Sequence, residues 1–349
     1  MPIGIPIVER CAKVHVPLKV TITGEHAVVY GYPALVAAID RRIDIRICRR
    51  GGGEILLTSK GASIWGDISL RCVGDRCVGE ISQGHVERLF IYAKKAIEIS
   101  SRIFGDIGGL DIEISSNIPP GAGLGTSAAI SAGIVTGYAY LANRSPGALE
   151  IASIARSVEM EVQGAASPMD TGAVSLGGVL LVRPRDNPPF KRINPRSRLE
   201  ILIAITPKKK STKETVSMVR DLYSKRKNVI DHLMRAIGEI SEEASKAIEE
   251  GDLAALCELM NINHNILRAM GVVDRESEGI ADIMRASGLE GVKISGGGWG
   301  GAVIGISRDG AKLEQALNSL SRAGYTVFIS SIASNGIRYE EIIPTQTNQ

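Results

Sequence analysis

Residues 110–142 read LDIEISSNIPPGAGLGTSAAISAGIVTGYAYLA, an alternating segment followed by a glycine-rich turn and an apolar run. Apolar and polar side chains alternate over residues 110–115, which is typical of a half-buried strand. No charged residue occurs from Ala128 to Leu141, so this run predicts a buried helix. Three glycines at alternate positions in the turn allow the backbone to bend tightly and to approach a ligand closely.

The turn also has the features of an anion site. Thr126 and Ser127 stand where the helix is expected to begin, so hydroxyls and unpaired N–H groups gather at its positive end. A simple helix cap after a flexible turn is the alternative. The spacing fits neither a Walker A loop nor a dinucleotide fingerprint. The candidate phosphate-binding residues are Pro119, Pro120, Gly121, Ala122, Gly123, Leu124, Gly125, Thr126, Ser127 and Ala128.

Near the N-terminus, alternation from Val14 to Ile22 predicts a strand with Lys19 on its polar face. A lysine in such a position is usually solvated. The strand leads into residues 24–31, which are bracketed by glycines. This turn either presents Glu25 and His26 to a ligand or is an ordinary loop.

Acidic residues follow the central helix. Ser145 is expected to cap a helix that Gly164 ends. Glu159 and Glu161 lie roughly 80° to either side of the apolar stripe of this helix, so periodicity alone does not choose between them. Asp170 is the single acid of a following loop over residues 165–172.

Elsewhere the pattern predicts a hairpin turn at residues 51–53, a solvated lysine loop at 208–210 and helices over much of 211–286. A second glycine run occupies residues 296–301 and contains Trp299. This residue either packs between the two lobes, which we favour, or contacts the bound substrates. The polar, proline-rich segment 183–198 suggests a domain boundary, giving domains 1–185 and 186–349.

Composition narrows the function classes. A chain of 349 residues favours two domains, and 44% hydrophobic with 23% charged residues indicates a globular protein. A net charge of +3 and 4% aromatic residues give no nucleic-acid footprint. No export signal or apolar run of membrane length is found. The five cysteines fit no zinc spacing and are interpreted as reduced thiols of a cytoplasmic protein.

These motifs together resemble the GHMP kinase superfamily, which includes galactokinases, homoserine kinases, mevalonate kinases and phosphomevalonate kinases. Residues 19–31, KVTITGEHAVVYG, are similar to the first motif of its mevalonate kinase branch, and residues 119–129 are similar to the phosphate loop. Glu159 and Asp170 are 11 positions apart, the spacing of that branch's magnesium-binding glutamate and catalytic aspartate. The resemblance therefore favours Glu159 over Glu161.

The resemblance implies an α+β fold of two lobes, an N-terminal lobe like domain 2 of ribosomal protein S5 and a ferredoxin-like C-terminal lobe. It implies ATP and mevalonate as substrates, Mg²⁺ as cofactor, no nucleic acid or membrane partner, and allows a homodimer. Ser127 and Glu159 would hold the metal, and Asp170 and Lys19 would be catalytic. The expected substrate contacts are Lys19, Glu25, His26, Asp170, Gly297 and Gly298.

Two alternatives stay open at this point, and two other branches of the superfamily are disfavoured. A sibling kinase acting on phosphomevalonate or a similar alcohol would need extra cations in the acceptor pocket. A catalytically silent metabolite sensor should have lost the lysine, the metal ligands or the acid, and all are present. Homoserine kinases typically lack the aspartate, and galactokinases place an aspartate shortly after Glu-His, where this chain has apolar residues.

Overall fold

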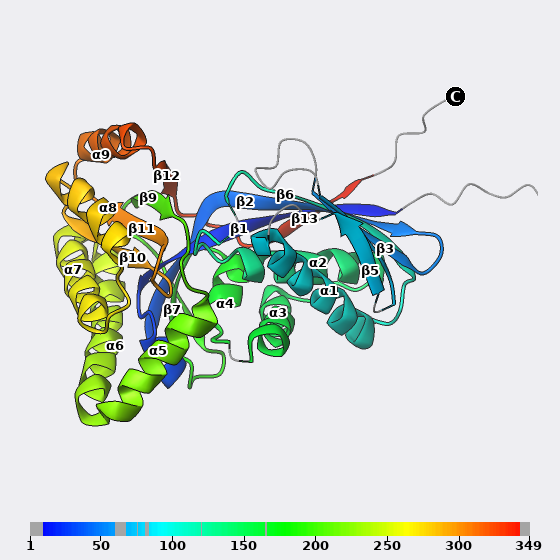
Figure 1. Ribbon diagram of the computed structural model, residues 1–349, viewed down its shortest axis with the longest axis horizontal. Coiled ribbons are helices and arrows are strands. Elements are labelled where there is room, and N and C mark those ends of the chain that lie inside the picture. Colours follow the sequence, from blue (N-terminus) through cyan, green and yellow to red (C-terminus); the bar gives the residue numbers. More distant parts are fainter. Residues whose placement is uncertain are drawn as a thin grey trace, which may run out of the picture.

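The computed structural model describes residues 10–59, 68–74, 76–80, 84–119, 121–164 and 166–342. The strands form a nine-stranded sheet and a four-stranded sheet toward the two ends of an elongated molecule (Figure 1). The larger sheet contains β1 (Cys11–Thr23), β2 (Ala34–Arg50), β3 (Glu54–Ser59), β4 (Ile68–Val73), β5 (Arg76–Glu80), β6 (Gly109–Ser115), β7 (Val179–Val182), β8 (Phe190–Ile193) and β13 (Arg338–Ile342).

Helices cover one face of this sheet (Figure 1). They are α1 (Gly84–Phe104), α2 (Thr126–Leu141), α3 (Ala148–Gln163) and α4 (Met169–Leu176). The predicted buried helix is α2, which has 15 buried residues and contacts β1 and β2. Its small residues bring it close to the sheet, because a Cβ at Gly137 would lie 2.3 Å from Ile47 Cγ2. This packing fixes the N-terminus of α2, and hence the glycine loop, relative to β1.

The second sheet has the order β10-β11-β9-β12 and is antiparallel. Its strands are β9 (Glu200–Thr206), β10 (Gly291–Ser295), β11 (Gly301–Ile306) and β12 (Thr326–Ser331). The accompanying helices are α5 (Thr212–Lys225), α6 (Lys227–Glu250), α7 (Leu253–Ala269), α8 (Arg275–Ala286) and α9 (Gly310–Arg322). The α+β architecture of two lobes is therefore confirmed.

Several local predictions are wrong. The turn at residues 51–53 does not close a hairpin, because β6 inserts between β2 and β3. Ser145 does not cap α3, whose N-cap is Gly147. Asp170 is not in a loop, since α4 already begins at Met169 with Pro168 as its N-cap. Long-range strand pairing decides the first of these points, and it is not visible in local periodicity.

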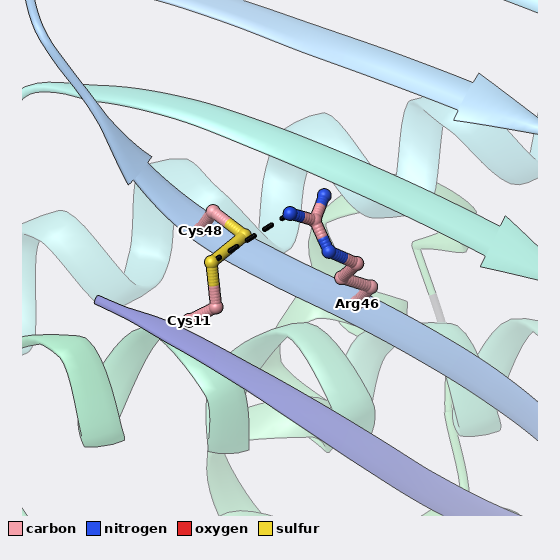
Figure 2. The surroundings of a disulfide bond; sticks show 3 residues. All are labelled: Cys11, Arg46 and Cys48. Atoms are coloured by element: carbon pink, nitrogen blue, oxygen red, sulfur yellow. Dashed lines mark hydrogen bonds between the residues drawn. A yellow bond between two sulfur atoms is a disulfide. The ribbon is translucent and has the colours of Figure 1, made fainter. Parts of the chain in front are cut away.

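The prediction that all cysteines are reduced thiols is also wrong. Cys11 and Cys48 face each other in the β1–β2 register and form a disulfide, with the Arg46 guanidinium 3.8 Å from the Cys11 sulfur (Figure 2). Cys72 and Cys77 form a second disulfide across β4 and β5. Cys257 is a buried free thiol. Sequence spacing did not reveal the pairs because cross-strand register, not spacing, brings these residues together.

The chain crosses between the two sheets more than once. The second sheet is built from residues after 185, but β8 and β13 return to the larger sheet, where β13 pairs with β1. The division into 1–185 and 186–349 stays a prediction. Within the described ranges, no helix combines the length and the apolar character that a bilayer crossing needs.

Candidate active site

The glycine loop lies directly against β1. Lys19 N–H donates to Leu124 O at 3.0 Å, and Gly125 is the N-cap of α2 with φ of 77°. A Cβ at Gly125 would lie 2.8 Å from Lys19 Cγ, so a side chain there would be strained and would press on the lysine stem. The loop and the Lys19 side chain are therefore parts of one site.

The N-terminus of α2 has the character that an anion requires. Its first turn contains no acidic residue, and no side chain caps it in the part of the chain that the structure describes. The first-turn N–H groups and the positive end of a buried helix therefore face the glycine loop. Pro120, one of the predicted phosphate-binding residues, lies outside the described residues.

Lys19 and Asp170 are paired. Lys19 Nζ lies 2.9 Å from Asp170 Oδ1 and donates to Thr21 Oγ1 at 3.3 Å. Lys19 is 2% exposed, so the expectation of a solvated lysine is wrong. The Asp170 side chain, in the first turn of α4, keeps 30% exposure. A buried cation thus holds a carboxylate that solvent and a small ligand can still reach.

The structure also separates the two glutamates of α3. Ser127 Oγ donates to Glu159 Oε1 at 3.0 Å, and Glu159 is 5% exposed. Glu161 instead points outward, where it pairs with Arg102 at 2.7 Å and Lys95 at 3.4 Å. Burial, followed by the charge of Asp170, raises the pKa of Glu159 to about 8. Glu159 is therefore the glutamate of α3 that lies against Ser127 at the end of the glycine loop.

Ser127 and Glu159 suit Mg²⁺. The ion prefers hard oxygen ligands and usually takes one or two from protein, completing its shell with water and phosphate oxygens. A buried carboxylate beside a hydroxyl at the phosphate loop supplies that donor set. Among the described residues no group of three or more His, Cys, Asp or Glu side chains could enclose a metal on its own. The metal role of both residues stays a prediction.

Replacing Glu159 with Gln tests this assignment. We expect turnover to fall about tenfold or more and the magnesium concentration for half-maximal rate to rise, because glutamine, unlike Glu159, does not ionise to bind the metal. Titrating MgCl₂ at fixed ATP measures both. Glu161→Gln is the matched control, since it removes a carboxylate from the same helix outside the site. Equal effects of the two substitutions would contradict the assignment.

The 24–31 turn is held by the second sheet. Glu25 is 2% exposed and pairs with Lys293 of β10. His26 has φ of 61° and its Nε2 donates to Gly297 O at 3.1 Å. Burial lowers the pKa of His26 to about 4, so the ring is neutral at physiological pH. The substrate contacts predicted for Glu25, His26 and Gly297 stay predictions, but these residues do meet at one place.

The second glycine run packs closely against the C-terminal half, and the substrate contact predicted for Gly298 stays a prediction. A Cβ at Gly298 would lie 2.1 Å from Val272 O, so this glycine packs against the α7–α8 turn. Trp299 N–H also donates to Val272 O at 3.0 Å, and its Nε1 donates to Gly271 O at 3.0 Å. Lys210 Nζ lies 4.1 Å from the centre of the ring. These contacts tie Trp299 to residues of the C-terminal half, and its packing between the lobes stays a prediction.

Lys208 is a candidate that sequence reasoning missed. Its Nζ donates to Thr212 Oγ1 at 2.9 Å, and burial, followed by the charge of Lys19, lowers its pKa to about 8. The Asp170 charge also acts on it. Lys209 pairs with Asp274 at 2.6 Å, so residues 208–210 are not simply a solvated loop. Lys208 is thus a cation whose pKa responds to the charges of both Lys19 and Asp170.

The fold and this site define a phosphoryl-transfer enzyme, with an anion-binding loop beside a buried lysine and an accessible carboxylate. Family models described as the GHMP kinases N terminal domain and GHMP kinases C terminal match residues 91–178 and 244–326. The chain belongs to the GHMP kinase family.

Within this family, the chain is similar to mevalonate kinases over nearly its whole length. A mevalonate kinase of Pyrococcus horikoshii is 33% identical over 93% of this chain and 97% of its own length. One of Aeropyrum pernix is 33% identical, with 95% and 99% covered. The crystal structure of the Methanococcus jannaschii mevalonate kinase matches with a TM-score of 0.74 and 27% identity, covering 92% of this chain and 98% of that one. A Lactococcus lactis galactokinase has a similar TM-score of 0.73 at 17% identity, over 94% and 95%.

Proposed function

We propose that the chain phosphorylates (R)-mevalonate with ATP and forms 5-phosphomevalonate for isoprenoid biosynthesis. The observation that carries the proposal is the Lys19–Asp170 pair, 2.9 Å apart, beside the glycine loop at the N-terminus of α2. Phosphoryl transfer depends mainly on positioning and on neutralising charge, and these groups supply both. The silent sensor is disfavoured because the site is assembled.

In the reaction, Asp170 accepts the proton of the acceptor hydroxyl and holds its oxygen in line with the γ-phosphorus. Lys19 stabilises the charge that develops on that oxygen. The loop N–H groups bind the triphosphate of ATP, with the positive end of α2 behind them. Ser127 and Glu159 would hold Mg²⁺, which when bound neutralises charge on the β- and γ-phosphate oxygens.

The fold alone does not select the acceptor, because a galactokinase and a mevalonate kinase match it with nearly equal TM-scores. Sequence identity to curated mevalonate kinases favours mevalonate. Lys208 is one cation of the kind that a phosphomevalonate kinase needs, so that sibling activity is the second candidate. Lys208 does not by itself decide between the two acceptors, because the carboxylate of mevalonate is also an anion that pairs with a lysine.

A coupled assay of ADP formation, with one acceptor at a time, separates these functions. We expect turnover with (R)-mevalonate and at least 100-fold lower kcat/KM with phosphomevalonate, homoserine and galactose, since buried unpaired groups penalise a wrong acceptor. A preference for phosphomevalonate would replace the proposal with the sibling activity. Absence of turnover with every alcohol would support the sensor.

The lowered pKa of Lys208 predicts that kcat/KM for mevalonate depends on pH. Its pKa is lowered to about 8, so in the free enzyme its charge is present below that pH and is lost above it. If Lys208 attracts the anionic acceptor, kcat/KM for mevalonate falls as the pH rises above about 8. Lys208→Met should lower kcat/KM about tenfold at pH 7 and abolish this limb of the profile. A profile unchanged in Lys208→Met would exclude the role.

A further inference from the structure

The Lys19 ammonium makes two different contacts in its buried position. Its Nζ lies 2.9 Å from Asp170 Oδ1 and donates a hydrogen bond to Thr21 Oγ1 at 3.3 Å. Asp170 Oδ1 itself has no hydrogen-bond partner among the described residues, so its contact with Lys19 is that of an ion pair. The hydrogen bond that sets the direction of the ammonium is therefore the one to Thr21.

Thr21 is firmly placed to receive this hydrogen bond. Side chains two positions apart on a strand point to the same face, so Thr21 lies beside Lys19 on β1. Thr21 is fully buried, and its N–H donates to Ser295 Oγ at 2.8 Å. Ser295 is the last residue of β10, in the second sheet. The backbone of Thr21 is thus held from the second sheet, and its hydroxyl offers Lys19 a fixed acceptor.

A hydroxyl suits this position because it orients the ammonium without neutralising it. An ammonium group has three N–H donors that rotate about the Cε–Nζ bond, so fixing one of them sets the directions of the other two. A second carboxylate would compete with Asp170 for the charge, whereas the threonine hydroxyl is neutral. The competing explanation is packing, since β-branched residues of any polarity suit a strand. Valine would then serve as well as threonine.

We propose that Thr21 is a positioning residue of the phosphoryl-transfer site, whose hydroxyl fixes the Lys19 ammonium so that its other N–H groups point at Asp170 and the acceptor oxygen. Thr21 acts only through Lys19 and touches no substrate. Without the hydroxyl, the ammonium keeps its charge but samples several directions, so fewer bound complexes are aligned for transfer. The inference rests on the proposed function, because that proposal assigns Lys19 and Asp170 to the reaction.

Replacing Thr21 with Val removes the hydroxyl and keeps the shape of the side chain. We expect kcat to fall about tenfold while KM for ATP changes by less than about threefold, because the phosphate loop keeps its contacts. Thr21→Ser retains the hydroxyl and should keep kcat within about threefold of wild type. A kcat of Thr21→Val within about twofold of wild type would overturn the proposal, as would equal losses in the Val and Ser variants.

A double-mutant cycle tests whether the effect passes through Lys19. In a Lys19→Met background, Thr21→Val should change kcat by less than about twofold, since no ammonium remains to be oriented. A further loss of about tenfold in that background would contradict this route. The cycle uses whichever alcohol the wild-type enzyme phosphorylates, so a different acceptor would change the proposed function and leave this test intact.

Thermal unfolding measures the same contact without any substrate. Thr21→Val should lower Tm in the wild-type background, where it leaves a buried donor without its acceptor, but not beside Lys19→Met, where both side chains are apolar. Coupling of the two substitutions in Tm but not in kcat would make the contact structural only and overturn the proposal.

Two further variants keep folding and function apart. If Thr21→Val does not fold, Thr21→Ala and Thr21→Ser replace the comparison, because these two differ only in the hydroxyl. Thr58→Val is the matched control. Thr58 is buried on β3 of the same sheet and its Oγ1 donates to Ile112 O at 3.4 Å, so its replacement should lower Tm and leave kcat unchanged.

Discussion

Asp170→Asn lowers kcat by about two orders of magnitude or more, the range expected when a positioned base is removed. Asparagine keeps the shape of the side chain, but it does not accept the proton of the acceptor hydroxyl. ATP affinity should stay within a few-fold, because the phosphate loop precedes α2 whereas Asp170 belongs to α4. Steady-state turnover and calorimetric ATP titration measure the two effects separately.

A control and an opposing outcome make this result specific. Asp282→Asn removes a carboxylate that is 68% exposed and paired with Arg285, and it should leave both quantities unchanged. Near-normal turnover of Asp170→Asn would mean that the acid is structural and orients Lys19 only. A large loss of ATP affinity would instead place Asp170 in the nucleotide site.

The sequence predicted the elements around the glycine loop because its signals there are local. Alternation over residues 110–115, glycines that permit positive φ and a charge-free helix are read within one stretch, and β6 and α2 match it. The choice of Glu159 over Glu161 needed the family resemblance, because helical periodicity left both half-buried. The burial of Glu159 beside Ser127 agrees with that choice.

What the sequence did not predict depends on contacts between distant segments. Lys19 is buried because the glycine loop, which follows it by about a hundred residues in the sequence, packs against its aliphatic stem. The sequence around Lys293 does not show that this lysine is buried in an ion pair, because its partner Glu25 lies near the other end of the chain. The insertion of β6 between β2 and β3 and the pairing of Cys11 with Cys48 likewise follow from register. Such features follow from tertiary pairing and not from periodicity.

Lys19→Met has the second large effect. Methionine retains much of the apolar stem that packs against Gly125, so the loop keeps its support while the ammonium is lost. We expect kcat to fall by about two orders of magnitude, because charge developing on the acceptor oxygen is no longer stabilised in a buried site. Lys13→Met is the control on the same strand, β1, and should leave kcat unchanged.

The double variant Lys19→Met with Asp170→Asn decides whether the two groups act as a unit. If Lys19 works on the oxygen that Asp170 deprotonates, the second substitution removes little that the first has left, and the double variant should be about as slow as the worse single variant. Independent roles would instead multiply the two losses to about four orders of magnitude. Measuring kcat for all four enzymes at saturating ATP and acceptor distinguishes the two outcomes, and multiplied losses would contradict a single Lys19–Asp170 unit.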